Sequence, residues 1–422
     1  MANELKKGPT GRYALLQAGY FMDCLVITNF AALFLAGRNF TTSQIGMVTS
    51  ISALISCVLS QMLGTMADRS DRIPLKYYLI VIMSVCMASF AGLAFLPHTM
   101  LPTMMFYITA FSLQAAVSPL ITSLCLQFTN SGYDINFGFA RSIGSLGYSL
   151  MALVMGNVTE MFGSEVIIPV FIAIYALLIV FLFFFPVPVK QEHMHVRAGN
   201  ALIEEQPSTM KEFVHRYHRF LVLNASFILF WFMNNLLGTY MIYFIKDLSG
   251  TAADVGTTLF VMAFSEIPAV MFGSNIMGRI GAPAMLRISM IGGVLKAVLF
   301  FIAPNITFWI WLNVTHILMS GFYQVSAVYY VYSIVGKKDI VKGQSLMGIA
   351  TAGICPMLAN CIGGWMIEAV PLKMILLIGI IIQSAAMIIC WVATDQNRFK
   401  TDYQGSVYVT GCIHTVGFLL ST

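Results

Sequence analysis

The stretch EVIIPVFIAIYALLIVFLFFFP, residues 165–186, decides the fold class. Its one charged residue, Glu165, stands first, and the apolar run that follows is as long as the roughly 20 residues with which an α-helix crosses a bilayer. Similar runs, each ended by charge, proline or glycine, occur at residues 12–37, 43–66, 77–96, 101–127, 138–161, 220–246, 254–277, 285–303, 306–332, 345–368 and 372–394. The sequence therefore predicts an all-α polytopic membrane protein with twelve transmembrane helices.

The composition of the chain agrees with lipid as the solvent of most of its surface. Of its 422 residues, 58% are hydrophobic and 10% are charged, whereas an ordinary soluble domain has about 25% charged residues. This excludes a water-soluble globular protein, a disordered chain and a secreted disulfide scaffold. The cysteines have no metal-ligand spacing, so we expect no disulfide, no bound metal and no cofactor.

A long polar stretch, residues 190–219, separates six apolar runs from the other six. The expected organisation is an N-terminal six-helix half (residues 1–187), a cytoplasmic linker (188–219), a C-terminal six-helix half (220–395) and a cytoplasmic tail (396–422). An internal repeat supports the two halves: the segment GNVTE that ends at Glu160 is matched by GWMIE, which ends at Glu368. Gly64 has a similar counterpart in Gly273. Duplicated halves are typical of secondary transporters.

The distribution of lysine and arginine predicts the orientation, because cytoplasmic loops retain them. With the N-terminus inside, 19 of the 23 basic residues fall on the inner side, and three (Arg38, Lys246 and Lys373) fall in outer loops. The remaining one, Lys296, lies within a span. We therefore expect both termini in the cytoplasm, with the protein in a bacterial inner membrane. The net charge of +5 is then explained by topology and by contact with anionic membrane lipids, and nucleic acid is not expected as a partner.

The sequence GTMADRSDR, residues 64–72, follows the second apolar run. Gly64 would allow close helix approach, and Asp68 would cap or pair at a helix end. Arg69 and Arg72 would bridge to neighbouring helix ends and lipid headgroups. This segment resembles the signature of the major facilitator superfamily, G-x-x-x-D-R-x-x-R, and the resemblance implies a role in conformational gating. The alternative is an ordinary positively charged inner loop.

The sequence FGFARSIGSLGYSL, residues 137–150, resembles the lactose permease branch of that superfamily, the oligosaccharide:proton symporters. In that branch an arginine at the start of the fifth helix binds sugar hydroxyls, and an aromatic ring seven residues later stacks on the sugar. Arg141 and Tyr148 match these positions and would lie on one helical face. Gly144 leaves room for a neighbouring helix or for a solute. The alternative is an interfacial arginine and a lipid-facing tyrosine.

Charged residues deep in apolar runs are the strongest functional signal, because each costs about 2.5 to 3.5 kcal/mol to insert. The ionisable residues in this position are Asp23, Arg141, Glu266, Lys296 and His316. In the lactose permease branch the eighth helix carries an acid, the ninth an arginine and the tenth a histidine. The resemblance implies that Glu266, Lys296 and His316 bind solute and the coupling proton. A structural ion pair beside a core histidine is the alternative.

Two departures from the branch weaken the transfer of lactose specificity. Met319 replaces the branch's second glutamate on the tenth helix, and the run 101–127 lacks the acid that pairs with the arginine of the fifth. We therefore expect Asp23 on the first helix to pair with Arg141 and to contact the solute.

The predicted function is secondary active transport of a small hydroxyl-rich solute, a sugar, oligosaccharide or nucleoside, by proton symport. The alternative is proton-driven export of drugs or metabolites. We expect a monomer whose partners are the solute, protons and membrane lipids. No HExxH motif, nucleophile elbow or phosphate-binding glycine loop is present, so an enzyme is not expected. A receptor role would leave Glu266, Lys296 and His316 unexplained.

Overall fold

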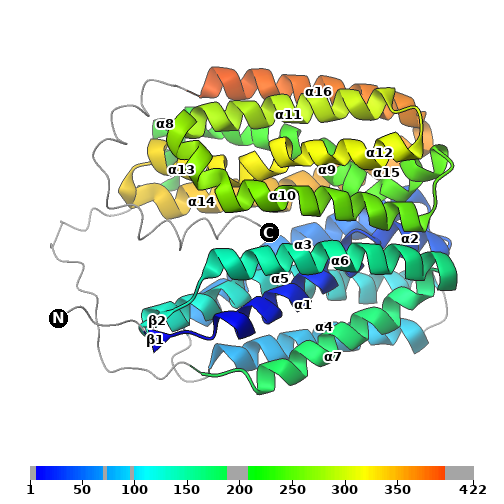
Figure 1. The fold of residues 1–422 in the computed structure, drawn as a ribbon, viewed down its shortest axis with the longest axis horizontal. Helices are drawn as coiled ribbons and strands as arrows, with labels where there is room; N and C mark the ends of the chain where they lie inside the picture. The colour runs from blue at the N-terminus through cyan, green and yellow to red at the C-terminus, as the bar shows by residue number, and fades with distance from the viewer. Residues whose placement is uncertain (1–5, 70–73, 96–98, 188–207, 395–422) are drawn as a thin grey trace.

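The fold is taken from a computed structural model that describes residues 6–69, 74–95, 99–187 and 208–394. Helices run nearly parallel to one long axis in two groups, with the N-terminal half below the C-terminal half in Figure 1. The helices of the first half are α1 (Thr10–Thr28), α2 (Ala31–Gly37), α3 (Thr42–Arg69), α4 (Leu75–Phe95), α5 (Met100–Asn130), α6 (Phe137–Phe162), the 3₁₀ turn η1 (Ser164–Val166) and α7 (Ile167–Phe183).

A short helix, α8 (Met210–Arg216), lies within the expected linker and precedes the helices of the second half. These are α9 (His218–Asp247), α10 (Ala252–Ile280), α11 (Ala282–Ile302), α12 (Ile306–Leu312), α13 (Phe322–Ile334), α14 (Ile340–Gly348), α15 (Cys355–Ala369) and α16 (Leu372–Ala393). Short 3₁₀ and π segments join some of them: η2 (Asn313–Thr315), η3 (Ile317–Gly321), η4 (Lys337–Asp339) and η5 (Ile349–Ile354).

Most of the expected spans are present as continuous helices. Within the described residues, ten segments are long and apolar enough to cross a membrane, and the bent pair α1 and α2 makes eleven. The expected span 306–332 is not among them, because its helix is broken into α12, η2, η3 and α13. The outer faces of the long helices are apolar, with Leu15, Val81 and Ile381 more than half exposed. This is the pattern of helices that contact lipid on one side.

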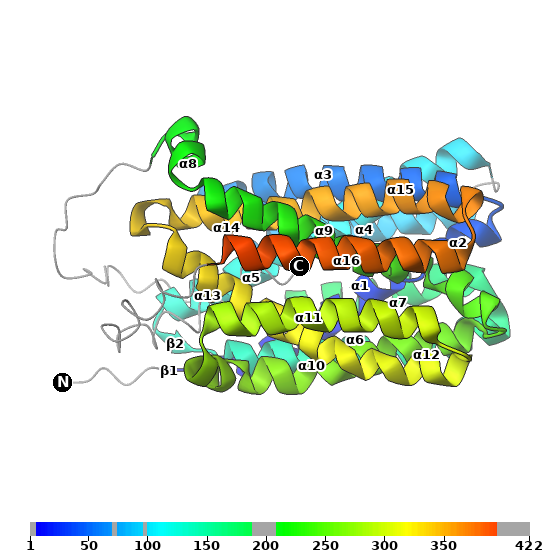
Figure 2. The same ribbon diagram turned by 90° about the horizontal axis from the view of Figure 1, so that it is seen from above.

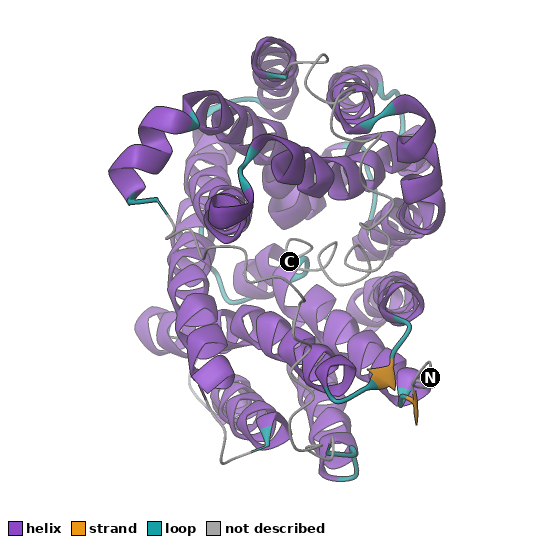
Figure 3. Cartoon of the chain, turned by 90° about the vertical axis from the view of Figure 1, so that its left-hand side faces the viewer, coloured by secondary structure: helices purple, strands orange, loops and turns teal. Residues whose placement is uncertain are grey.

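One end of the bundle carries α8 and the two-residue strands β1 (Lys6–Lys7) and β2 (Tyr133–Asp134), which pair in parallel. We call it the linker end, and Figure 3 views the helices from this side. The backbone N–H and the hydroxyl of Ser208 donate to the buried carboxylate of Asp339 at 3.0 and 2.7 Å, and Lys342 donates to the Ser208 carbonyl. The start of α8 is therefore fixed to the segment between α13 and α14.

The opposite end, which we call the far end, brings the two halves into direct contact. Figure 2 shows α3 beside α15, and α6 packs along α10. Glu368, at the end of α15, accepts hydrogen bonds from the backbone N–H and the hydroxyl of Ser43 in the first turn of α3, at 2.9 and 2.5 Å. Glu160, at the end of α6, accepts from the N–H of Ala252, the first residue of α10, at 2.9 Å. The two glutamates of the sequence repeat therefore occupy equivalent places, each at the N-terminus of a helix from the other half.

Glycine permits the close approach of the halves at the far end. A Cβ atom on Gly156 would lie 2.8 Å from the Cα of Gly256, and one on Gly364 would lie 2.3 Å from the carbonyl oxygen of Thr42. Backbone therefore packs directly on backbone at both crossings, α6 on α10 and α15 on α3.

Candidate functional site

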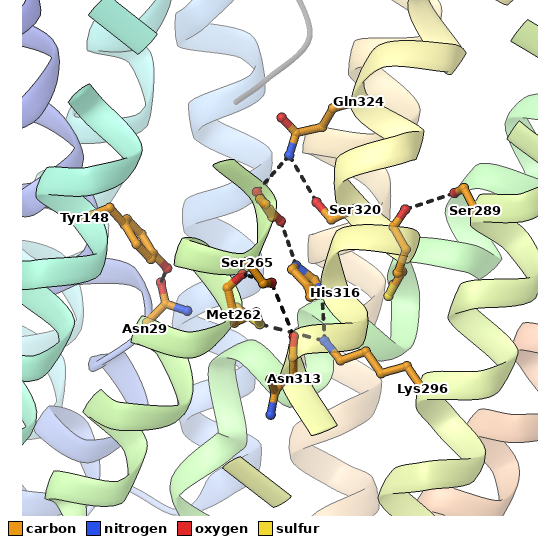
Figure 4. Close-up of polar contacts among 12 residues, drawn as sticks. Asn29, Tyr148, Met262, Ser265, Ser289, Lys296, Asn313, His316, Ser320 and Gln324 are labelled. Carbon is orange, nitrogen blue, oxygen red and sulfur yellow. Dashed lines mark hydrogen bonds and ion pairs between the residues drawn. The ribbon is translucent and has the colours of Figure 1, made fainter. Parts of the chain in front are cut away.

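The C-terminal half places three ionisable side chains from α10, α11 and the broken tenth span in one chain of contacts (Figure 4). His316 Nε2 lies 2.8 Å from Glu266 Oε1, and Lys296 Nζ lies 2.8 Å from His316 Nδ1. His316 and Lys296 are 2% and 4% exposed, and the side chain of Glu266 is 18% exposed. The sequence analysis grouped these three residues by their chemistry and by the helices that carry them, and the structure places them in contact.

The contacts of this cluster are compatible with two arrangements of its protons. A carboxylate only accepts and an ammonium only donates, so with Lys296 charged the bare Nδ1 of His316 accepts from it. The Nε2–H of the same neutral ring then donates to Glu266. Shifting a proton from Lys296 to Nδ1 and from Nε2 to Glu266 gives a second state with the same contacts. These hydrogen-bonded contacts can therefore pass a proton between Lys296 and Glu266 without any contact being lost.

Two side chains that the sequence analysis did not single out complete the surroundings of Glu266. Gln324 Nε2 donates to Glu266 Oε2 at 3.2 Å and to Ser320 Oγ at 3.0 Å. The sequence does contain a signal for Ser320 and Gln324, because their spacing from His316, i+4 and i+8, places all three on one face of a helix. Within the described ranges, no group of three or more His, Cys, Asp or Glu side chains is arranged to hold a metal ion.

The break in the tenth span positions His316. The helix tightens into the 3₁₀ turn η2 and then widens into the π segment η3 on either side of this residue. The carbonyls of Asn313 and Met319 accept hydrogen bonds from the hydroxyls of Ser265 and Ser289, at 3.4 and 2.9 Å. These bonds from α10 and α11 satisfy irregular backbone that the membrane interior would otherwise leave unpaired, and π segments are frequent at functional sites.

On the N-terminal side, α6 presents Arg141 against α1. The guanidinium carbon lies 4.0 Å from the ring centroid of Phe21, and Nη1 donates to Ser145 at 3.1 Å. A Cβ on Gly144 would lie 2.8 Å from the Phe21 ring, so the glycine makes room for the ring on which the arginine rests. Arg141 and Glu266 lie within electrostatic range of each other across the boundary between the halves.

Tyr148 faces α1 as well, seven residues along α6. Its hydroxyl donates to Oδ1 of Asn29 at 2.8 Å (Figure 4). Asn29 is a residue that sequence reasoning missed, and it lies at the 45° bend between α1 and α2. No pattern in the sequence marked this bend, since the run 12–37 contains no proline and no charged residue next to Asn29.

The expected pair between Asp23 and Arg141 is wrong for this structure. Asp23 is 0% exposed, and neither carboxylate oxygen has a hydrogen-bond partner among the described residues. Arg141 instead lies over Phe21 and donates to Ser145. A fully enclosed carboxyl also offers no surface to a solute in this conformation.

The segment expected to gate the transporter is described only in part. Gly64 lies in α3, but a Cβ there would have no described atom within 4 Å, so the expected close helix approach is absent at this position. Its repeat counterpart Gly273 does pack closely, since a Cβ would lie 2.6 Å from Val325. The side chains of Asp68 and Arg69, and all of Arg72, lie outside the described residues.

Comparison with known proteins identifies relatives that match most of the chain. Residues 20–377 match the MFS_1 like family. The chain is similar to an uncharacterized transporter, YwbF, of Bacillus subtilis (strain 168), with 24% identity over 309 residues, 70% of this chain and 71% of that one. It is similar to a maltose permease of Geobacillus stearothermophilus, with 24% identity over 306 residues, 70% of this chain and 72% of the permease.

Solved structures share the fold. The nucleoside transporter NupG superposes with a TM-score of 0.72 at 15% identity, covering 93% of this chain and 99% of that chain. A bacterial homolog of the human lysosomal transporter Spinster, in an inward-facing and unoccupied conformation, gives a TM-score of 0.64 at 13% identity, with 93% and 97% of the two chains covered.

Proposed function

Since the chain belongs to the MFS_1 like family and is a membrane transporter, we propose that it moves a small hydroxyl-rich solute by proton symport. The solute class comprises sugars, oligosaccharides and nucleosides. The predicted resemblance to the major facilitator superfamily and the all-α polytopic fold are both confirmed, and they are the basis from which the proposal starts.

The contact chain from Glu266 through His316 to Lys296 is the observation that carries proton coupling. Buried charges are expensive in a membrane and are kept mainly for function. Here an acid and a base are joined by a ring that can pass a proton at either nitrogen. Protonation of Glu266 changes the net charge of the cluster by one, so the cluster responds to a pH gradient.

Arg141 and Glu266 support a hydroxyl-rich solute between the halves. Their opposite charges interact across the boundary, and a guanidinium offers several donors in a plane while a carboxylate only accepts. Hydroxyl groups can satisfy both. The named substrates of the relatives, maltose for the permease and nucleosides for NupG, are of this class, and we propose the same class for this chain.

Alternating access would follow from the arrangement of the halves. The contacts of Glu160, Glu368 and the far-end glycines close that end in this conformation, and rocking of the halves would open it. From the distribution of basic residues we propose that the linker end faces the cytoplasm, that both termini lie there, and that the protein works as a monomer.

Transport by reconstituted protein tests the proposal. Proteoliposomes with an imposed pH gradient should accumulate one of a panel of labelled sugars and nucleosides, and a proton ionophore should abolish accumulation. Accumulation that survives the ionophore contradicts proton coupling. Movement of solute against the direction of proton flow would instead indicate the exporter.

A further inference from the structure

The side chain of Asp23 is fully buried in the N-terminal half, apart from the Glu266 cluster of the C-terminal half. It lies near the middle of the bent span that α1 and α2 form together, five residues before Thr28, where α1 ends. Both of its carboxylate oxygens expose less than 1 Å² and neither has a hydrogen-bond partner among the described residues. Glu266, the acid in the middle of α10, has partners on both oxygens. The isolation of Asp23 therefore needs a separate explanation.

The groups around Asp23 are neutral. Those in electrostatic range are Tyr20 and Cys24 on α1 itself, Cys86 on α4 and Tyr175 on α7. From α5, Gln114 approaches the same region, where it donates to the carbonyl of Tyr20 and accepts from Tyr175.

The titratable groups of α6 are engaged elsewhere. Arg141 lies over Phe21 and donates to Ser145, and Tyr148 donates to Asn29. No described cation therefore faces the Asp23 carboxyl from the helices packed around it. An ionised carboxylate without a partner is strongly disfavoured in such a place, whereas a neutral carboxyl is tolerated far better.

We propose that Asp23 is a second proton-binding site, distinct from the Glu266 cluster, and that it holds an occluded proton in this conformation. Loading converts the carboxylate to the carboxylic acid by adding one proton and one positive charge, and release reverses this on the other side of the membrane. With both oxygens enclosed, the proton exchanges with neither solution while the far end is closed.

The neighbouring residues explain how a change of conformation releases the proton. Gln114 and Tyr175 carry hydrogen-bond donors in this region that are used on other groups here: Tyr175 donates to Gln114, and Gln114 donates to the carbonyl of Tyr20. α1 is bent by 45° where it joins α2, so movement at this bend shifts Asp23 relative to α5 and α7. Donors that reach the carboxylate stabilise its charged form and free the proton. The role of Asp23 in transport rests on the proposed proton symport, whereas the presence of a proton on Asp23 does not depend on that proposal.

Infrared spectroscopy of the purified protein in lipid tests the bound proton without any solute. A neutral carboxyl that lacks hydrogen bonds has its carbonyl stretch at the high-frequency edge of the carboxylic-acid region. We expect such a band at neutral pH, its loss in Asp23→Asn, and its persistence in Glu266→Gln and in Asp247→Asn, which neutralises an exposed acid at the end of α9. Absence of the band from the wild type, or its persistence in Asp23→Asn, overturns the proposal.

Stoichiometry gives the second test. In proteoliposomes that accumulate a solute, Asp23→Asn should lower the number of protons carried per solute by one, and Asp247→Asn should leave it unchanged. An unchanged ratio in Asp23→Asn overturns the coupling role. If Asp23→Asn does not fold, absence of the band from Glu266→Gln overturns the proposal. If no solute accumulates, the proposed function fails while the infrared result still decides the site.

Discussion

Glu266 and Asp23 are both acids within membrane-spanning helices, and the two halves surround them differently. Glu266 contacts His316 and Gln324 and is connected to Lys296 through the histidine ring. Asp23 has no hydrogen-bond partner among the described residues and no exposed surface. A carboxyl side chain thus lies in a hydrogen-bonded network at one site and without a described partner at the other.

The difference shows that a buried acid can be accommodated in two ways. In a network, either protonation state keeps hydrogen bonds, so the proton can be exchanged at little cost in stability. In isolation, only the neutral state is tolerated, so the proton stays until the surroundings change. Removing a charge from the network should therefore lower the stability of the protein, whereas neutralising Asp23 should leave the stability unchanged or raise it.

The largest effect is expected for Glu266→Gln. The amide keeps the size of the side chain but cannot take up the proton, so uphill accumulation driven by a pH gradient should fall to equilibration, while exchange of solute across the membrane continues. Uptake and counterflow in proteoliposomes measure the two activities. Asp247→Asn is the matched control and should accumulate normally. Full accumulation by Glu266→Gln would remove this residue from coupling.

A stability loss comes next, for Lys296→Met. This change takes the ammonium away from a buried network and leaves Glu266 with His316 and Gln324 alone, and breaking a buried charge pair can cost about 3 to 5 kcal/mol. The double variant with Glu266→Gln should recover much of the loss. Thermal unfolding in detergent measures all three. Additive losses would mean that Lys296 and Glu266 are not coupled and that the network does not exist.

A smaller effect is expected for Asp23→Asn. Because no partner is lost, the neutral amide should leave thermal stability unchanged or higher, in contrast to Lys296→Met. Combined with Arg141→Gln, the effects should add to within about 0.5 kcal/mol, as for residues that do not interact. A larger coupling energy would mean that Asp23 and Arg141 interact, as expected from the sequence. Asp23 would then be part of a network of partners, as Glu266 is.

The smallest effect concerns Asp339, a buried acid with partners outside the membrane-spanning helices. Burial raises its pKa, but the two hydrogen bonds from Ser208 outweigh this and hold the pKa below its usual value. Its contribution to holding α8 is therefore complete above about pH 4, the ordinary value for aspartate, and is lost as pH falls through the lowered pKa. Proteolysis next to α8 should increase in acid for the wild type, and Asp339→Asn should be equally sensitive at neutral pH.

The sequence predicted the fold well because lipid imposes a simple requirement on helices. Apolar runs such as 165–186 marked the spans to within a few residues, and the repeat of Glu160 in Glu368 marked equivalent places at the far end. The cluster of Glu266, Lys296 and His316 was also predicted, because buried charges are rare in a membrane and need partners.

Other features depend on side-chain direction, which the spacing of residues along a helix does not settle. Asp23 and Arg141 were expected to meet, yet Asp23 is buried without a hydrogen-bond partner among the described residues and Arg141 lies on Phe21. The break around His316 and the bend at Asn29 were missed for the same reason. At both places side chains of other helices make hydrogen bonds, Ser265 and Ser289 beside His316 and Tyr148 to Asn29, and no local pattern reveals them.

The carboxylates of Glu160 and Glu368 are exposed, and each sits at the positive end of a helix dipole from the opposite half. Interactions of this kind weaken as dissolved ions screen them. The ionic strength of the solution at the far end should therefore shift the balance between closed and open forms, independently of solute and pH. Raising salt on that side alone should change the turnover rate of the wild type, and should change it less in a variant that carries glutamine at both positions.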